Sequence, residues 1–271
     1  MDDALSVELL DDDSDASGGG GGGVRLWVHI ADPTRYVQRG SALEQEARRR
    51  GATIYLPTGS IPMFPIDLAA GPLSLRPGVA SCALSIGVVL DTEGAIDAAH
   101  PPIITPSTVC VRRLTYQQVD AVLDPIAADD AATGSSTGRL CEEPSGLEGG
   151  DALDPAASEV TAEEVEVMRR LEWLSEQRLA WRVAGGSMER IAPVGLPDMT
   201  IKARRPDAAD EEADAAADDS GWSVTVTTGG AAPEGGARRM VTEGMLLAGE
   251  AVAAYGADNG VPLAYRSQTV S

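Results

Sequence analysis

Apolar and polar residues alternate with a period of two along Val24–Ala31, which predicts a β-strand. The turn-forming residues Asp32-Pro33-Thr34 follow it and predict a loop at its end. A shorter apolar and polar stretch at residues 4–10 is expected to pair with this strand as a hairpin. Further strands are predicted at residues 83–90, with a return segment at 95–99, at 109–114, and as a pair at 199–203 and 222–227.

Helical periodicity and capping residues predict three longer helices. The first covers residues 41–50, with Ser41 as the cap, Glu44 three residues later, and Gly51 as its end. A second helix is predicted at residues 163–183. Its apolar residues near one face are Val165, Met168, Leu171 and Leu174, and Trp173 and Trp181 are expected to be core or helix-packing residues.

The third helix is predicted from about residue 238 to residue 255, ending at Gly256. Five apolar residues recur on it at helical spacing and predict its buried face. They are Val241, Met245, Ala248, Val252 and Tyr255. A short helix capped by Thr115 is expected after the strand at 109–114.

Several stretches lack periodicity. Residues 58–78 are interrupted by prolines and predict a structured loop, and ordered loops of this length are uncommon unless they have a function. Segments at about 11–23, 124–161 and 204–220 are rich in Ala, Gly and acidic residues and are expected to be disordered, low-complexity insertions.

Charge is distributed unevenly along the chain. The net charge of −21 argues against a polyanionic partner at first sight. However, residues 11–15, 120–166 and 207–219 carry net charges of −4, −12 and −7, so the remaining residues carry +2. A nearly neutral body with clustered arginines can present a local basic path to RNA, although solvated helix faces would account for at least half of them. These arginines are Arg35, Arg39, Arg48, Arg49, Arg50, Arg112 and Arg113.

The three cysteines, Cys82, Cys110 and Cys141, are odd in number and lack metal-ligand spacing, which indicates a reducing compartment. The sequence contains neither an apolar run of about 18 residues nor a targeting leader. Met1 stands directly before an acidic pair, which suggests an internal piece of a longer protein. Neither His29 nor His100 has a partner at zinc spacing, so both are interpreted as non-ligands.

The acidic pair Asp2-Asp3 is the first candidate for chemistry. Hydrolysis of a phosphodiester with Mg²⁺ needs several carboxylates close together, and two are too few. Adjacent residues of a strand also point to opposite faces, so both can serve one site only if the backbone turns there or if two metals lie on either side. Asp32 is expected to cap the turn before Pro33, with a metal role as the minority interpretation.

Longer motifs give this pair a context. The sequence contains MDDAL, HIADPTRYVQRGSALEQEARRRGATIYLP, IPMFP, LSLRPG, RLTY and MLLAGEAVAAYGADNGVPLAYR. Together they resemble the catalytic (RNB) domain of the ribonuclease II and ribonuclease R family of exoribonucleases. IPMFP and the last motif look most like the plant organellar branch. The resemblance implies a partial RNB domain over residues 1–271, with an α+β fold: a mixed, largely antiparallel sheet of about six strands with packed helices.

The resemblance also implies an activity, namely Mg²⁺-dependent, processive 3′-to-5′ hydrolysis of single-stranded RNA to nucleoside 5′-monophosphates in RNA processing and decay. It makes Asp2 the catalytic residue and a Mg²⁺ ligand, Asp3 a second Mg²⁺ ligand, and Tyr55 an aromatic that stacks on a 3′-terminal base. A core position is the alternative for Tyr55. It further implies a chloroplast or mitochondrial location, the cytoplasm being the alternative, with neither DNA nor a membrane as partner.

Two departures from the family pattern limit these expectations. The family's first two aspartates would precede Met1, and its phosphate-binding arginine motif should lie outside this fragment. Bacterial members also place a second clamping aromatic near residues 199–203, where this sequence has none. The alternative function is therefore a catalytically incomplete RNA-binding or scaffold fragment, and the chain alone is expected to be inactive or weak.

Overall fold

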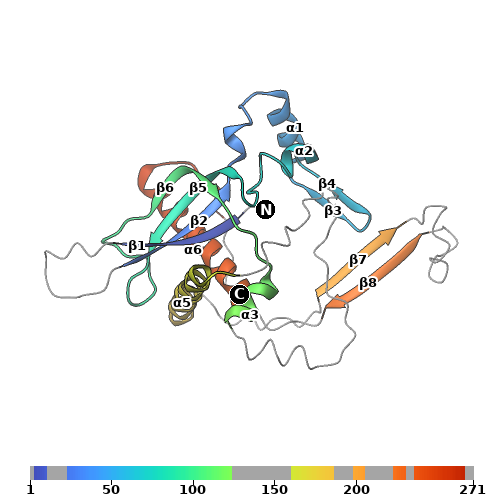
Figure 1. The fold of residues 1–271 in the computed structure, drawn as a ribbon. Helices are drawn as coiled ribbons and strands as arrows, with labels where there is room; N and C mark the ends of the chain where they lie inside the picture. Colours follow the sequence, from blue (N-terminus) through green and yellow to red (C-terminus); the bar gives the residue numbers. More distant parts are fainter. Residues whose placement is uncertain are drawn as a thin grey trace, which may run out of the picture.

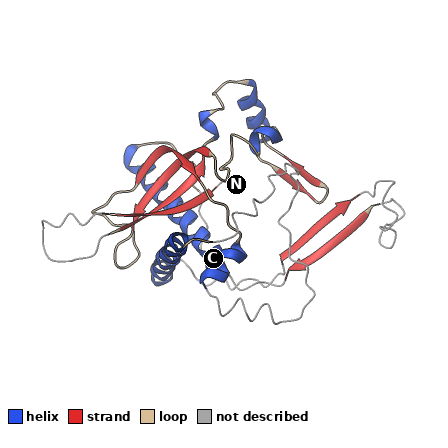
Figure 2. Cartoon of the chain, in the orientation of Figure 1, coloured by secondary structure: helices blue, strands red, loops and turns tan. Residues whose placement is uncertain are grey.

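The computed structural model describes residues 3–10, 23–123, 160–185, 198–204, 222–229 and 235–265 (Figures 1 and 2). Its strands are β1 (Asp3–Leu9), β2 (Val24–Ala31), β3 (Ile54–Leu56), β4 (Gly59–Ile61), β5 (Ala80–Val89), β6 (Ile103–Cys110), β7 (Asp198–Arg204) and β8 (Ser223–Gly229). The helices are η1 (Pro33–Arg35), α1 (Ala42–Arg50), α2 (Ile66–Ala69), α3 (Tyr116–Leu123), α5 (Ala162–Ala184) and α6 (Gly236–Asn259). The three low-complexity insertions expected from the sequence lie almost entirely outside the described residues.

Strands β1, β2, β5 and β6 form the main sheet in that order, and every pairing in it is antiparallel. The expected hairpin of residues 4–10 and 24–31 is therefore confirmed. The sheet has four strands rather than about six, because β3–β4 and β7–β8 form separate two-stranded sheets. Antiparallel sheets combined with packed helices confirm the α+β fold class.

Strand β6 begins earlier than the sequence pattern indicated. It covers Ile103–Cys110 rather than residues 109–114, and Pro106 lies within it opposite Leu84. β6 is an edge strand, where a residue without an N–H group can face away from the ladder. Proline therefore does not end the strand here. The expected return segment at 95–99 forms only an isolated bridge between Leu90 and Ile96.

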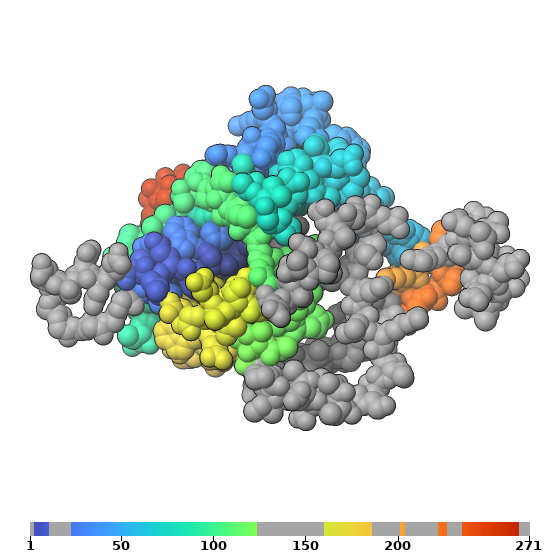
Figure 3. Space-filling view, in the orientation of Figure 1, coloured from blue at the N-terminus to red at the C-terminus, as the bar shows by residue number. Residues whose placement is uncertain are grey.

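Helices α5 and α6 cover one face of the main sheet and close the core. Figure 3 shows α5, in yellow, against the blue surface of β1. The core combines alternate residues of β2 and β5 with apolar residues of both helices. These are Leu26, Val28, Ile86 and Val88 from the strands and Leu171, Leu174, Met240 and Leu247 from the helices. Burial of each such side chain contributes about 1.5 to 3 kcal/mol relative to its exposure.

The predicted helix caps at Ser41 and Thr115 are confirmed. The Glu44 amide donates to Ser41 Oγ at 3.2 Å, and Gly51 ends α1 in the left-handed conformation with φ +76°. The Gln118 amide donates to Thr115 Oγ1 at 3.2 Å at the start of α3.

Helix α5 shows which of the two tryptophans packs. Trp173 is 54% exposed, so its predicted core position was wrong. Trp181 does pack, since the Arg178 guanidinium carbon lies 4.2 Å from the centroid of its ring.

The buried face of α6 is rotated from the predicted one. Of the predicted residues, Ala248 is buried and Met245 and Val252 pack against the core, whereas Tyr255 is 46% exposed. Gly244, Leu247 and Ala251 are buried as well. The physical reason is ionic: Glu243 and Glu250 face α5 and pair with Arg182 and Arg178, so a packed face contains acids.

The predicted end of α6 was also wrong. Gly256 lies inside the helix, which ends at Gly260 with φ +63°. A Cβ atom on Gly256 would lie 3.0 Å from Leu263 Cγ, so glycine at this position allows the chain after the helix to pack closely against it.

The start of α6 is held by a side chain from another helix. Asp120 of α3 accepts a hydrogen bond at 2.8 Å from the Ala237 amide, through Oδ1. A Cβ atom on the preceding Gly235 would lie 2.8 Å from Asp120 Cγ, so glycine admits the carboxylate. Asp120 therefore acts as a remote N-cap that joins α3 to α6.

Replacing Asp120 with alanine is expected to lower the free energy of unfolding by about 1 kcal/mol, the usual cost of a lost N-cap. Urea unfolding followed by circular dichroism measures this change. Asp120→Asn is the matched control, because its amide oxygen still accepts from Ala237 while the charge is lost. An equal loss of stability in both variants would assign the effect to charge rather than to the hydrogen bond.

Candidate active site

The candidate carboxylates lie at the end of the main sheet where β1 begins and β2 ends. Asp3 is the first residue of β1 and pairs with Ile30 of β2. It shares a strand face with Leu5, whose side chain packs against Gly244 of α6. Asp3 is therefore on the helix-covered side of the sheet. Asp2 lies outside the described residues.

Asp32 follows directly after β2 at the same end of the sheet. Its Oδ1 atom accepts from the Thr34 amide at 3.0 Å and from Thr34 Oγ1 at 2.5 Å, which confirms the predicted turn cap. Its amide donates to the carbonyl of Cys82 at 3.1 Å and continues the β2–β5 pairing by one residue. This carboxylate is thus fixed in orientation by the turn.

An apolar cavity of about 310 Å³ adjoins this end of the sheet, since Ile30, the pairing partner of Asp3, forms part of its wall. A Cβ atom on Gly249 would contact nothing within 4 Å, so this glycine leaves the cavity open. The remaining wall residues come from α6 and the chain after it: Met245, Ala248, Val252, Ala253, Leu263, Ala264 and Tyr265. An apolar recess beside a carboxylate can receive a flat apolar group while the carboxylate binds a cation.

The sequence interpretation missed this cavity because its last wall is formed by the return of the chain after α6. The return is fixed by the Val261 amide, which donates to Gly256 O at 2.9 Å, and by Tyr265 Oη, which donates to Ala253 O at 3.4 Å. The signal available in the sequence was the pair of glycines, Gly249 and Gly256, within an otherwise strong helix.

A row of hydrogen bonds crosses the opposite face of the sheet. His29 bonds through Nε2 to Ser6 Oγ at 2.9 Å and through Nδ1 to Ser85 Oγ at 2.6 Å, and Ser85 Oγ continues to Ser107 Oγ at 2.5 Å. The row joins all four strands through hydroxyl groups. Burial holds the pKa of His29 below its ordinary value, which favours the neutral imidazole.

Acid is expected to weaken the fold through His29. Because the pKa of His29 is lowered on folding, the unfolded chain binds this proton more tightly. The stability that His29 contributes is fully present above its pKa in the unfolded chain, about 6.5. This stability is lost as the pH falls below that value towards the lower pKa of His29 in the folded protein. Unfolding free energies of wild type and His29→Gln between about pH 7 and pH 5.5 should converge as pH falls. Parallel curves of unfolding free energy against pH would contradict the assignment of this acid sensitivity to His29.

Tyr55 lies on the small β3–β4 hairpin and is 79% exposed, so the alternative core position is wrong. The turn of this hairpin contacts β7, because the Ala203 amide donates to Pro57 O at 2.9 Å. The predicted loop at residues 58–78 contains β4 and α2.

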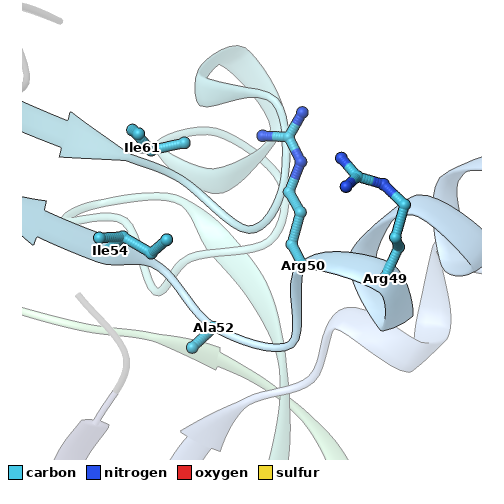
Figure 4. Close-up of a pocket in the computed structure, with 5 residues that line it drawn as sticks. All are labelled: Arg49, Arg50, Ala52, Ile54 and Ile61. Carbon is cyan, nitrogen blue, oxygen red and sulfur yellow. The ribbon is translucent and has the colours of Figure 1, made fainter.

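A pocket of about 320 Å³ lies between this hairpin and the end of α1 (Figure 4). Ile54 and Ile61 face it from paired positions of β3 and β4, and Arg49 and Arg50 extend beside it from the helix. Both arginines bond to Glu46, and the Arg50 side chain also donates to Pro62 O at 2.8 Å. These bonds hold the basic end of α1 against the hairpin. Ile54 and Ile61 share the strand face opposite to that of Tyr55.

The oxygen donors present suit a hard cation, because Mg²⁺ takes one or two carboxylates and retains waters. Asp3 and Asp32 supply such donors at one end of the sheet. Within the described residues, no group of three or more His, Cys, Asp or Glu side chains gathers as a metal-binding set. Two carboxylates with water are thus the most that this part of the chain offers. No helix in the same part is long and apolar enough to cross a membrane.

The comparisons with a family model and with individual proteins agree with each other. The family model described as RNB domain matches residues 1–271. An uncharacterised ribonuclease of Synechocystis is 33% identical over 269 residues, which cover 99% of this chain and 30% of that protein. The chloroplastic/mitochondrial ribonuclease II of Arabidopsis thaliana is 30% identical over 273 residues, covering 100% of this chain and 26% of that protein.

Among solved structures, RNase R of Mycoplasma genitalium in complex with double-stranded RNA has a TM-score of 0.62 at 20% identity. The match covers 96% of this chain and 35% of that one. The fold of the described residues is thus shared with that protein. The chain spans only about a quarter to a third of the length of the relatives it matches.

Proposed function

The chain belongs to the RNB domain family, and we propose on that premise that it forms part of a 3′-to-5′ exoribonuclease that releases nucleoside 5′-monophosphates from single-stranded RNA. The match over residues 1–271 is the observation that carries this proposal. Two features of the fold support it: Asp3 pairs with Ile30, which lines an apolar recess, and Tyr55 is exposed for contact with a base. DNA and membranes are not expected partners.

Asp2 and Asp3 are the residues that would hold Mg²⁺, with Asp2 also acting in catalysis. When bound, Mg²⁺ stabilises negative charge on a phosphate and favours ionisation of a water molecule. The task of the two carboxylates is to position and neutralise the cation. Placed where β1 enters the sheet, Asp3 has a backbone fixed by its pairing with β2.

Tyr55 would bind the RNA independently of its base sequence, because every base offers a flat face for stacking. Its exposure leaves the ring free on one side of the β3–β4 hairpin. Bonds from Arg50 to Pro62 and from Ala203 to Pro57 anchor that hairpin on two sides. A tyrosine on an anchored hairpin loses little conformational freedom when it stacks.

A chloroplast or mitochondrial location is proposed together with this activity. The support is the 30% identity to the Arabidopsis thaliana protein, whose name includes both organelles. Fusing the full protein to a fluorescent reporter and imaging plant cells tests the location. A uniformly cytoplasmic signal would contradict it.

The activity is tested by incubating the full parent protein, beside this chain alone, with oligoadenylate and Mg²⁺, using RNA labelled at the 3′ end in one arm and at the 5′ end in the other. The parent protein is expected to release labelled mononucleotide from the 3′ label at once and from the 5′ label only late, whereas this chain alone should release little or none. Chelation of Mg²⁺ should stop release. RNA binding without any release, in this chain and in the parent protein, would favour the alternative of an RNA-binding or scaffold fragment.

Replacing Tyr55 with alanine is expected to weaken binding of single-stranded RNA by about 1 to 3 kcal/mol, the usual value of one base–aromatic stack. Thermal stability should not change, since the ring is exposed. Fluorescence anisotropy with labelled oligoadenylate measures the affinity. Tyr55→Phe keeps the stacking surface and should bind as wild type does, and a loss in Tyr55→Phe equal to that in Tyr55→Ala would rule out stacking.

A further inference from the structure

Two arginines near the candidate active site lack the acidic partner that nine other arginines of the described residues have. Arg35 follows the turn at Asp32, and Arg76 precedes β5. Within the described residues neither forms an ion pair. The arginines that do are Arg25, Arg48, Arg49, Arg50, Arg112, Arg170, Arg178, Arg182 and Arg239.

Both cations lie close to the phenol of Tyr36. The Tyr36 hydroxyl and Cys82 Sγ are 3.5 Å apart and share a hydrogen bond, which holds the pKa of Tyr36 above its ordinary value. The positive charges of Arg76 and Arg35 act on the same phenol in the opposite direction. The Arg76 amide donates to Ser81 Oγ at 3.2 Å, which ties this arginine to the residue before Cys82.

The Arg76 side chain also contains an unused donor. Its Nε atom is buried and forms no hydrogen bond, although the residue as a whole is only half-buried. A buried N–H group without a partner costs free energy that an acceptor would restore. The terminal Nη groups of a planar guanidinium suit the oxygens of a phosphate, and a phenol adds an O–H donor.

The cluster lies on the same side of the main sheet as Asp3. Cys82 shares a strand face with Leu84, which pairs with Ile30, and Ile30 pairs with Asp3. Two strand spacings and two residues along β5 separate Cys82 from Asp3, or about 12 Å between backbone positions. This distance is too long for contact with an RNA phosphate bound at Asp3. It suits a neighbouring phosphate of the same RNA strand.

We propose that Arg35, Tyr36 and Arg76 form a phosphate-binding site that holds a backbone phosphodiester of the RNA next to the one at the aspartates. The inference rests on the proposed function, because a polymeric substrate is what places a second phosphate at this distance. Its role is positioning: it fixes the strand relative to Asp3 and takes no part in bond breaking.

The test measures the affinity of the chain for labelled oligoadenylate over a range of salt concentrations. Arg35→Gln and Arg76→Gln are each expected to weaken binding about tenfold and to lower the salt slope by about 0.7, the value for one phosphate contact on a single strand. Tyr36→Phe should weaken binding without changing the slope, because it removes a donor and no charge. Arg169→Gln, an exposed arginine of α5, has the same charge change and should leave the slope unaltered.

Two further readouts separate this site from the proposed activity and from folding. Titration with inorganic phosphate should shift the Arg76 Nε–Hε signal in ¹H–¹⁵N spectra, whether or not the chain hydrolyses RNA. Arg76→Lys should keep the salt slope, since the charge remains. It should lose part of the affinity, because lysine lacks the planar set of N–H donors of the guanidinium. Unchanged slopes in both glutamine variants, or an Arg76 signal unmoved by phosphate, would overturn the proposal even if mononucleotides are released.

Discussion

Replacing Gly94 with alanine is expected to destabilise the fold by about 2 to 5 kcal/mol, enough to remove much of the stability of an ordinary domain. Gly94 has φ +90°, and a Cβ atom there would lie 2.8 Å from the Gln177 backbone carbon and closer still to its oxygen. Neither the strain of the positive φ nor the contact with the backbone of α5 can be relieved without moving other backbone atoms. Gly94 O also accepts a hydrogen bond at 3.2 Å from Arg178, which is only 2% exposed.

Gly40→Ala is the matched control for this prediction. Gly40 has a similar φ of +81°, but a Cβ atom there would contact nothing within 4 Å. Its substitution should cost only the left-handed backbone penalty, about 1 to 2 kcal/mol. Urea unfolding of both variants gives the comparison. Equal losses would show that close packing of the turn against α5 contributes nothing.

Replacing Asp2 or Asp3 with asparagine in the full parent protein is expected to lower the rate of mononucleotide release by at least about a hundredfold. Asparagine keeps the shape of the side chain and loses the charge that a hard cation requires. Steady-state release from oligoadenylate measures the rate. Asp67→Asn, an exposed aspartate on α2, should release mononucleotides at the wild-type rate.

The dependence on Mg²⁺ concentration separates the roles of the two aspartates. For a residue that only binds the cation, higher Mg²⁺ should restore part of the rate, so Asp3→Asn is expected to be rescued more than Asp2→Asn. Activity of both variants equal to that of wild type at low Mg²⁺ would contradict the assignment of these carboxylates. Affinity for RNA at the same time checks that the variants still bind substrate.

Local chemistry made part of the fold predictable from the sequence. Ser41 with Glu44, and Gly51 nine residues after the helix begins, are signals that act over a few residues, so both ends of α1 were found. The β1–β2 hairpin was equally clear, because alternation of apolar residues reports directly on a sheet with one buried face.

Features that depend on distant contacts could not be predicted in this way. The buried face of α6 includes Glu243 because Arg182, 61 residues earlier, neutralises it. Pro106 is accepted in β6 because the strand lies at an edge, which only the sheet order reveals. For the same reason the recess beside Asp3 was not foreseen, since its wall depends on how residues 261–265 fold back onto α6.

Residues 32–79 leave the main sheet after β2 and return to it at β5, the strand directly beside β2. The two ends are joined at the sheet itself, where Asp32 bonds to Cys82, so the excursion between them does not determine the position of Asp3. Loop-closure entropy grows by only about 0.6 kcal/mol for each doubling of length. Insertions, deletions and substitutions from α1 to α2 can therefore accumulate while the sheet stays intact. Evolution can alter the hairpin that carries Tyr55, and with it the proposed binding of the RNA, independently of the aspartates.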